Sequence, residues 1–307
     1  MFISRLKYLL KRFFQALKNE NIIVIFKKIC NTILYSNKID LDKLNVNENL
    51  GLDDLFLKFG TDKGSLDGKK TYTFLNSTKD GTKKFKNYYD WINRENPRSF
   101  DYQLGHNFTP LYEKYLGSLK KKPLKILEIG SANGHAVASF FYYFPNSKIY
   151  TIDIKKSYFF FYKSKRINFH CLDCMNNDAV NKFIIKNGKF DIIIDDSDHT
   201  HPTFTNNIKN FYPALNCGGI YILEDFKYAD QELTLIKKHN ENSGRKIMSN
   251  FTITMDEIFN FIKNKKMFKH EILKEDNLKY IFDTVDKVEI HYGEHPLSSM
   301  GLLFKKF

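Results

Sequence analysis

Cysteine is scarce in this sequence, and its scarcity excludes a disulfide-stabilised fold. The 307 residues include four cysteines, which are scattered along the chain, whereas disulfide frameworks use many cysteines at regular spacings. The single Cys171-x-x-Cys174 pair has no second pair, so it does not predict a zinc site. A metal or redox role for this pair and a plain role as small residues at a strand end both remain open. The low cysteine content fits the reducing cytosol.

Apolar runs long enough to cross a membrane are missing as well. The segment NIIVIF at 21–26 is far shorter than the ~20 residues that a bilayer-spanning helix needs. Charged residues interrupt the apolar stretches near the N-terminus and no small-residue cleavage site follows them, so we expect no signal peptide. These absences predict a cytoplasmic protein.

Positive charge is concentrated in the first part of the chain. The formal net charge is +13, and residues 1–38 hold eight Lys or Arg against one Glu. Apolar residues recur there at helical spacing, with Lys7, Lys11 and Lys18 on the other face, so we expect a basic amphipathic helical region within 1–50. Such a helix can lie on the anionic inner face of a membrane, or dock on its own domain or on a partner chain such as a second copy. No basic motif interleaved with aromatic residues is present, so we expect no nucleic-acid partner.

From residue 123 onward, short apolar segments alternate with segments of helical character. The expected strands are 125–130, 148–154, 166–173, 190–196, 219–226, 286–292 and 300–307. The expected helices are 135–144, an aromatic-rich segment at 155–165, 178–187, 203–215 and 254–265. This alternation predicts an α/β fold, a doubly wound sheet of seven strands covered by helices on both faces. A short link before residue 300 predicts a closing hairpin and therefore an antiparallel last strand.

Every predicted parallel strand ends in an acidic residue. These acids are Glu128, Asp153, Asp173, the Asp195–Asp196 pair and the Glu224–Asp225 pair. In open α/β sheets, ligands bind beyond the carboxyl ends of the strands, where the strand order reverses. One such acid alone is ordinarily a cap or a solvated loop residue, but five strand ends in succession predict a binding site along this edge.

The first strand-to-helix turn, LEIGSANGHA, indicates the kind of cofactor. It has Gly130 and Gly134 in a G-x-x-x-G spacing and lacks the G-x-G-x-x-G pattern of dinucleotide sites. Glu128 would repel a pyrophosphate and suits a cationic ligand. Asp153 is placed to accept hydrogen bonds from ribose hydroxyls, and Asp173 can receive an adenine amino group. These features fit S-adenosylmethionine, and together with the closing hairpin they resemble the seven-stranded, Rossmann-like fold of S-adenosylmethionine-dependent methyltransferases. Ser131 and Asp195 complete the expected cofactor-binding set.

The stretch FDIIIDDSDHTH crowds acids directly after a buried strand. Burying carboxylates is unfavourable unless positive charge lies among them. Asp196, Glu224 and Asp225 are expected to converge beside the cofactor, and three hard oxygen ligands predict Mg²⁺ or Mn²⁺. A lysine ammonium filling the same gap would instead overturn the proposed metal chemistry. His199 follows Asp196 by three residues and titrates near neutrality, which suits a general base.

Two of these segments resemble a known family. The D-G-S-H and E-D motifs of metal-dependent sugar O-methyltransferases are similar to Asp196-Ser197-Asp198-His199 and Glu224-Asp225. This family methylates deoxysugars of macrolides such as mycinamicin and tylosin. Further similar segments are KFGTDKGS (58–65), GHNFTPLYEKYL (105–116), FPNSKIYTIDI (144–154) and FYPALNCGGIYILEDF (211–226). The resemblance covers roughly residues 55–226 and the closing hairpin. It implies that Asp196, Glu224 and Asp225 hold Mg²⁺, and that His199 is the base for methyl transfer from S-adenosylmethionine to a sugar hydroxyl. His201 is expected at the start of the next helix, with a base role as the weaker alternative.

The chain departs from the family pattern in three places. Ser197 and Asp198 replace Gly and Ser, which makes this loop bulkier and more acidic. The first-turn loop is short. Residues 65–104 separate two motifs that usually lie closer, and their aromatic and lysine side chains suit either an acceptor lid or a plain surface insertion. We therefore divide the chain into the helical region 1–50, a pre-sheet cap or lid region 51–122 and a methyltransferase domain 123–307.

The leading hypothesis is an enzyme, a Mg²⁺-dependent sugar O-methyltransferase. Its acceptor would be a nucleotide-linked sugar or a glycan, for example in capsule or other surface polysaccharide assembly. A second hypothesis is methylation of a non-sugar small molecule or a phosphate-derived group. A third is a non-catalytic scaffold subunit, against which the first turn, the three acids and His199 all argue.

Overall fold

The computed structural model describes residues 38–47, 49–64, 106–155, 160–243, 251–293 and 297–307. The predicted N-terminal amphipathic helix and the whole of the proposed lid at 65–104 lie outside these residues. In the part of the chain that the structure describes, no helix combines the length and the apolar character needed to cross a membrane. The division of the chain into three regions stays a prediction.

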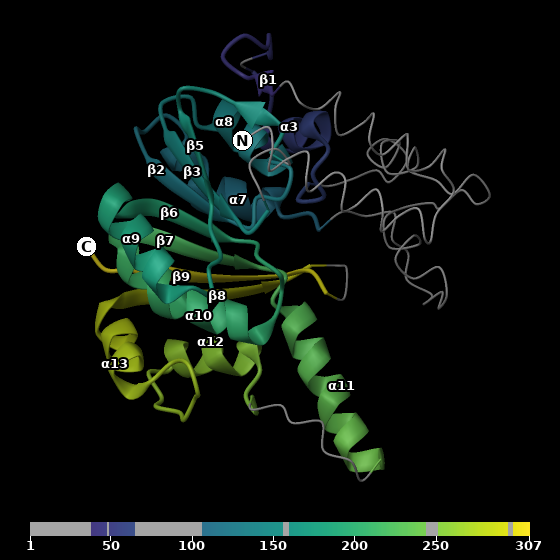
Figure 1. Ribbon diagram of the computed structural model, residues 1–307, viewed down its shortest axis with the longest axis vertical. Helices are drawn as coiled ribbons and strands as arrows, with labels where there is room; N and C mark the ends of the chain where they lie inside the picture. The colour runs from purple at the N-terminus through teal and green to yellow at the C-terminus, as the bar shows by residue number, and fades with distance from the viewer. Residues whose placement is uncertain (1–37, 48, 65–105, 156–159, 244–250, 294–296) are drawn as a thin grey trace, which may run out of the picture.

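A seven-stranded sheet forms the centre of the fold, as predicted (Figure 1). The strand order is β5-β3-β2-β6-β7-β9-β8. The strands are β2 (Lys125–Ile129), β3 (Lys148–Asp153), β5 (Ile167–Cys171), β6 (Phe190–Asp195), β7 (Leu215–Glu224), β8 (Val285–Tyr292) and β9 (Ser299–Lys305). Strands β5, β3, β2, β6 and β7 pair in parallel, and β9 is antiparallel to β7 and β8. The predicted α/β fold with an antiparallel last strand is therefore confirmed.

The strand order reverses beside β2. From β2 the chain builds outward through β3 to β5 and then returns to form β6 on the other side of β2. Such a reversal leaves a crevice at the carboxyl ends of the two central strands. The binding site predicted from the sequence therefore has its expected place in this topology.

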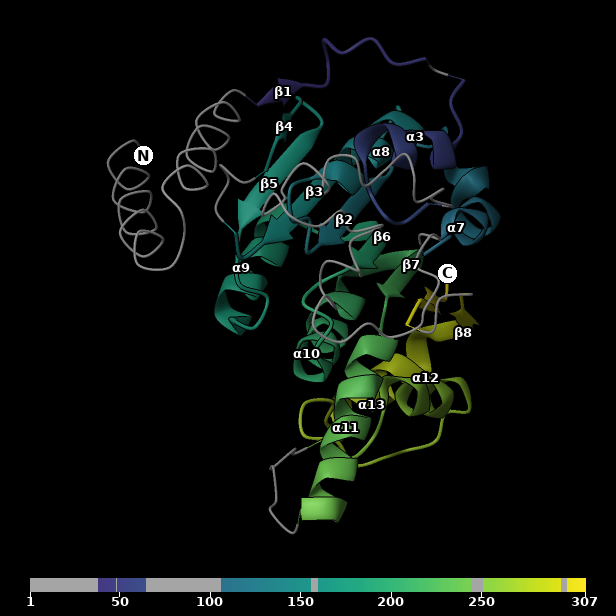
Figure 2. The same ribbon diagram turned by 90° about the vertical axis from the view of Figure 1, so that its right-hand side faces the viewer.

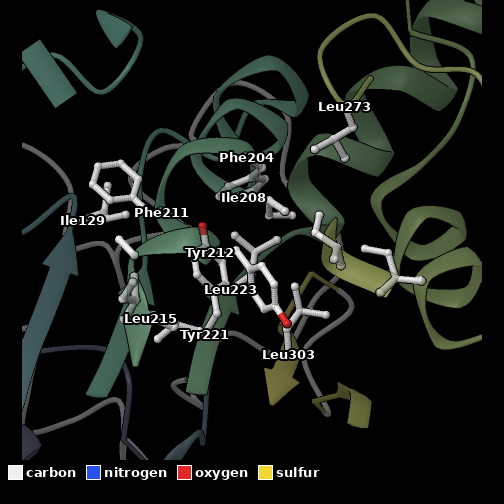
Figure 3. Packing of buried hydrophobic residues seen from close by; sticks show 14 of the residues in the cluster. Ile129, Phe204, Ile208, Phe211, Tyr212, Leu215, Tyr221, Leu223, Leu273 and Leu303 are labelled. Carbon is white, nitrogen blue, oxygen red and sulfur yellow. The ribbon is translucent and has the colours of Figure 1, made fainter. Parts of the chain in front are cut away.

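Helices cover both faces of the sheet. On one face the core includes residues of α3 (Leu52–Phe59), α7 (Thr109–Leu116) and α8 (His135–Tyr143). On the other it includes residues of α9 (Asn177–Asn187), α10 (His201–Phe211), α12 (Met255–Lys263) and α13 (Glu275–Thr284). Figure 3 shows this second core, where Phe204, Ile208 and Phe211 lie near Tyr221 and Leu223 of the sheet.

Side chains alternate between these two cores along each strand. In β6, Ile193 faces the α10 side, whereas Ile192 and Ile194 face the α3 side. Successive residues of a strand point to opposite faces because the backbone is pleated. The same alternation places neighbouring acids at the strand ends on opposite faces of the sheet.

Local sequence signals explain several helix ends. The Thr254 hydroxyl accepts a hydrogen bond from the Glu257 backbone N–H at the start of α12, and the Glu257 carboxylate accepts one from the Thr254 N–H. Helix α9 begins after Asn176, whose side chain accepts from the Ala179 N–H. Helix α3 ends at Gly60, which has a φ of 76°.

Three predictions of secondary structure need correction. The aromatic-rich segment at 155–165 is not helical where it is described: β4 (Tyr162–Lys163) pairs in parallel with β1 (Ile39–Asp40) (Figure 2). Burial alternates there between Phe160 and Tyr162, a period of two that the abundance of aromatic residues conceals. Strand β7 begins at Leu215 rather than at 219, and α11 (Lys227–Ser243) and α13 were not predicted. Cys171, the last residue of β5, and Cys174, three residues beyond it, are both free cysteines.

Candidate active site

The first turn after β2 needs glycine at two positions. Gly130 and Gly134 both have a φ of 87°. A Cβ at Gly130 would lie 2.0 Å from the carbonyl oxygen of Asp196, and one at Gly134 would lie 2.4 Å from the ring of Phe160. No side chain fits at either distance. The predicted cofactor turn is therefore in direct contact with the loop of the predicted metal ligands.

Asp153 connects this turn to the end of β3. Its Oδ2 accepts a hydrogen bond from the Ala132 N–H at 2.7 Å, and its Oδ1 accepts one from the Lys155 N–H at 2.6 Å. Ser131, in the same turn, is buried, and its hydroxyl has no hydrogen-bond partner among the described residues. A buried hydroxyl without a partner is unfavourable, so Ser131 fits a contact to a polar ligand.

Glu128 is buried on the α3 side of the sheet, at the carboxyl end of β2. Its side chain is 1% exposed, and its Oε2 has no hydrogen-bond partner within the described part of the chain. Burial raises the pKa of Glu128 to about 8. The nearby Lys63 ammonium lowers this pKa, whereas repulsion from Asp196 raises it further. A carboxyl group in this state ionises more readily when a cation binds beside it. Glu128 therefore suits the cationic ligand that the sequence predicts.

Two other predicted cofactor residues lie apart from the turn. Asp173 is exposed in the turn after β5. Asp195 is buried on the α10 side of β6, where its Oδ2 accepts from the Tyr221 hydroxyl at 2.5 Å and its Oδ1 from the Asn207 amide at 3.1 Å. Burial raises the pKa of Asp195 to about 7, although these hydrogen bonds lower it. Both oxygens of Asp195 already accept a hydrogen bond from the protein.

Asp196 points to the opposite side and meets a lysine. The Lys63 ammonium lies 2.6 Å from Asp196 Oδ2 and also donates to Glu224 Oε2. Burial alone would lower the pKa of Lys63, but Asp196 and Glu224 raise it well above its usual value. Burial would likewise raise the pKa of Asp196, but Lys63 holds it below its usual value. A lysine ammonium is therefore present between Asp196 and Glu224, which is the arrangement that we expected from the sequence to overturn the metal chemistry.

Glu224 is held on both oxygens. Its Oε2 accepts from Lys63, and its Oε1 accepts from the hydroxyl of Tyr112 in α7. Glu224 is completely buried, so neither bond is exchanged with bulk water. The predicted metal ligand Glu224 thus has two protein partners where a metal ion was expected.

Asp225 lies beside a second cationic side chain. Its Oδ1 is 3.1 Å from His106 Nδ1, which also lies 2.7 Å from the Ser298 hydroxyl. Burial lowers the pKa of His106, but Asp225 outweighs this effect and the pKa rises to about 9. His106 is therefore protonated at neutral pH. Asp225 itself has a φ of 55°, a left-handed conformation that aspartate adopts more readily than most residues.

His199 faces Asp196 from the same loop. Its Nε2 lies 3.7 Å from Asp196 Oδ1, and its ring stacks on Tyr228 at a centroid distance of 5.4 Å. The Nδ1 atom is buried without a hydrogen-bond partner among the described residues. His199 has a φ of 57°, so this loop also passes through a left-handed conformation. The ring is thus fixed by stacking and directs Nε2 toward the acidic residues.

One group of side chains could hold a metal ion. Asp196, His199 and Asp225 each offer one ligand atom, and these atoms all lie within 4.8 Å of one another. Two carboxylates with room for water suit Mg²⁺, and an added imidazole suits Mn²⁺. Glu224 can join this group only when Lys63 releases its Oε2. The residues present fit a divalent cation, while the assignment of the individual ligands stays a prediction.

His201 lies at the start of α10, as expected. Its Nε2 donates to the Ile253 carbonyl oxygen at 2.6 Å, and its side chain is buried. Burial lowers the pKa of His201 to about 4, although this hydrogen bond raises it. These contacts lie on α10 and the loop before α12, and they do not include Asp196 or Asp225.

Sequence reasoning did not assign three residues of this site. Lys63, His106 and Tyr112 precede the sheet in the chain and contact Asp196, Asp225 and Glu224. All three lie inside the segments KFGTDKGS and GHNFTPLYEKYL. The signal was present as motif similarity, but nothing in either segment indicates which side chain meets which strand end.

Comparisons with known proteins find relatives for part of the chain. No protein-family model matches it. It is 30% identical over 131 residues to an 8-demethyl-8-(2-methoxy-alpha-L-rhamnosyl)-tetracenomycin-C 3'-O-methyltransferase of Streptomyces olivaceus, covering 40% of this chain and 33% of that protein. It is 27% identical over 130 residues to the mycinamicin VI 2''-O-methyltransferase of Micromonospora griseorubida. This match covers 39% of this chain and 31% of that protein. The chain thus matches about a third of the length of these curated relatives.

The fold has a matching solved structure. The MycE methyltransferase of the mycinamycin biosynthetic pathway, in complex with Mg, SAH and mycinamycin VI, aligns with a TM-score of 0.54 and 16% sequence identity. The alignment covers 84% of this chain and 55% of that one. At this identity the likeness establishes the fold. The chain is thus similar over about 130 residues to these sugar O-methyltransferases and shares the fold of this solved methyltransferase.

Proposed function

We propose that this chain is an S-adenosylmethionine-dependent O-methyltransferase that methylates a sugar hydroxyl. The observation that carries the proposal is the contact between the first turn and the β6 loop, where a Cβ at Gly130 would lie 2.0 Å from the Asp196 carbonyl oxygen. A methyl donor held by the turn would lie directly beside an acceptor held by this loop. The similarity to O-methyltransferases of rhamnosyl and olivosyl compounds supports the same activity.

The cofactor would lie across the ends of β2, β3 and β5. The proposed contacts come from Glu128, Gly130, Ser131, Gly134, Asp153 and Asp173. Glu128 would balance the cationic end of S-adenosylmethionine, and Ser131 would use its unpaired hydroxyl. Asp195 would act indirectly, because its hydrogen bonds to Tyr221 and Asn207 fix the end of β6.

The acceptor would bind beside Asp196, Glu224 and Asp225. A divalent cation held by these residues would bind two neighbouring sugar hydroxyls and lower the pKa of one of them. His199 would accept the proton of that hydroxyl at Nε2, the nitrogen that faces Asp196. In this role His199 is not a metal ligand. The hydroxyl proton goes to His199, while the methyl group passes from the sulfur of the cofactor to the hydroxyl oxygen.

The physiological acceptor is proposed as a nucleotide-linked sugar or a glycan, such as a surface polysaccharide under assembly. The net charge of +13 supports an anionic acceptor or an anionic surface nearby. A cytoplasmic location, with peripheral contact to the inner membrane face through the N-terminal helix, belongs to the same proposal. Self-association of the chain is proposed with it.

A methyl-transfer assay tests the activity. The full chain is incubated with S-adenosylmethionine, Mg²⁺ and a panel of nucleotide-sugars, and the products are examined by mass spectrometry for the gain of one CH₂ group. His199→Ala should lose about 10²–10⁴-fold in turnover, the usual contribution of a general base, and still bind S-adenosylmethionine in calorimetry. Excess chelator should abolish turnover, and added Mg²⁺ should restore it.

Asp196→Asn and Asp198→Asn form a matched pair for the same assay. Asp198 is an exposed acid of the same loop that accepts hydrogen bonds from Thr200 and Thr203. Asp196→Asn should be inactive, while Asp198→Asn should keep most of its activity. Equal activity of the two variants would contradict the assigned site, and a failure of the wild-type chain to bind S-adenosylmethionine would refute the proposed function.

A further inference from the structure

The Lys63 ammonium occupies oxygens that the proposed metal site needs. It lies 2.6 Å from Asp196 Oδ2 and also bonds Glu224 Oε2. The remaining oxygen of Asp196 lies 3.7 Å from His199 Nε2, and the remaining oxygen of Glu224 accepts from the Tyr112 hydroxyl. One oxygen of each carboxylate is therefore bound to the lysine. A cation that binds these two oxygens together has to take the same place.

The site requires a cation in this place at all times. Glu224 is completely buried and Asp196 is partly buried, and two such carboxylates repel each other unless a cation lies between them. Lys63 is 3% exposed. Its ammonium supplies one charge and three donors on a flexible four-carbon stem.

The backbone that carries Lys63 is fixed, but its side chain is long. The Lys63 carbonyl oxygen accepts from the Phe108 N–H at 2.8 Å, which ties this turn to the segment before α7. Movement of the ammonium therefore needs only side-chain rotation. Glu128, with an Oε2 that has no hydrogen-bond partner among the described residues, offers another carboxylate to which the ammonium can turn.

We propose that Lys63 and a divalent cation bind the Asp196–Glu224 pair in alternation. Lys63 fills the site until a metal ion enters, and this competition lowers the metal affinity of the site. The inference rests on the proposed function, because it takes the carboxylates to be metal ligands. Mg²⁺ binds oxygen at about 2.1 Å and leaves no room for an ammonium between the same two oxygens. Binding of the metal therefore includes the displacement of Lys63.

Direct metal binding tests this inference without any turnover. Mn²⁺ is titrated into the full wild-type chain and into Lys63→Met, and free Mn²⁺ is followed by electron paramagnetic resonance. Lys63→Met should bind Mn²⁺ about tenfold more tightly or better, because no buried ion pair has to be broken first. Lys63→Arg keeps the charge and should stay close to the wild-type affinity.

Lys305→Met is the matched control for the loss of a buried lysine. The Lys305 ammonium is buried too, but it donates to the carbonyl oxygens of Pro213 and Leu215 and to the Tyr280 hydroxyl. This variant should leave the Mn²⁺ affinity unchanged. In the presence of chelator, Lys63→Met should have a lower melting temperature than the wild type. Saturating Mn²⁺ should remove this difference in melting temperature.

The outcomes separate this inference from the proposed function. Equal or weaker Mn²⁺ binding by Lys63→Met, with clear binding by the wild type, overturns the alternation and leaves the metal site intact. Binding by Lys63→Met alone would mean that Lys63 blocks the site permanently, which overturns the alternation and contradicts a metal requirement of the wild-type chain. Binding by neither protein overturns both. If Lys63→Met does not fold with or without Mn²⁺, Lys63→Gln gives the same comparison with hydrogen-bond donors retained.

Discussion

Two neutral histidines, one at the start of α10 and one between α12 and α13, should make the protein sensitive to mild acid. His201 and His270 stack at a centroid distance of 5.4 Å, and burial lowers the pKa of each to about 4. Their usual value is 6.5, so between pH 6.5 and about pH 4 the unfolded chain binds protons that the native protein does not. Stability then rises with pH across this window and is lost as the pH falls through it.

The magnitude follows from the width of this window. One group contributes about 1.4 kcal/mol per pH unit where only the unfolded state is protonated. Between about pH 7.5 and pH 5 this amounts to roughly 2 kcal/mol for His201, which is almost fully buried, and less for His270, which is partly exposed.

Two substitutions remove the titration and keep the hydrogen bonds. His201 Nε2 donates to the Ile253 carbonyl oxygen, and the terminal amide of glutamine in His201→Gln can do the same. His270 Nδ1 accepts from the N–H groups of Ile272 and Leu273 at 3.1 Å, and the amide oxygen of asparagine in His270→Asn can replace it.

Urea unfolding at the two pH values provides the assay. The wild-type free energy of unfolding should fall on acidification by about 2 kcal/mol more than that of His201→Gln, and by a smaller excess over that of His270→Asn. The double variant should be the least sensitive to acid. An identical pH dependence in wild type and double variant would refute the argument that these imidazoles are held neutral by burial.

Three further predictions concern single contacts. Gly130→Ala places a Cβ against the Asp196 carbonyl at a φ of 87°, so it should cost about 1–3 kcal/mol in chemical denaturation and abolish calorimetric binding of S-adenosylmethionine; unchanged binding would contradict the assigned turn. Tyr221→Phe leaves Asp195 Oδ2 without its donor and should lower the free energy of unfolding by about 1–3 kcal/mol, which an unaltered urea midpoint would disprove. Thr254→Ala removes the N-cap of α12 and should cost about 1 kcal/mol, whereas Thr254→Ser should be nearly neutral.

The sheet was predictable because its signals are local. Each parallel strand is a short apolar run with a turn after it, and the predicted segments match β2, β3, β5 and β6 and overlap most of β7. The pattern was weaker where aromatic residues hid the alternation, as in β4, and where a polar helix such as α11 followed a strand. Local periodicity depends on the burial of one face, and it gives little signal for elements with few buried residues.

The site was predictable only in part. The sequence located acids at the strand ends, because chain order and parallel pairing bring these ends to one edge of the sheet. The sequence also predicts that Asp195 and Asp196 face opposite sides of the sheet, because neighbouring residues of a strand alternate between its two faces. This signal was not used to predict the site.

The sequence by itself determined the α/β class, the strand ends that carry the acids and the glycine turn, since all of these depend on residues close together in the chain. Only the tertiary structure decided which cations meet those acids. Lys63 reaches Asp196 across 133 positions, and His106 and Tyr112 come from the same pre-sheet region. The physical reason is that the packing of α3 and α7 on the sheet sets these contacts, and no local pattern encodes how two segments so far apart come together.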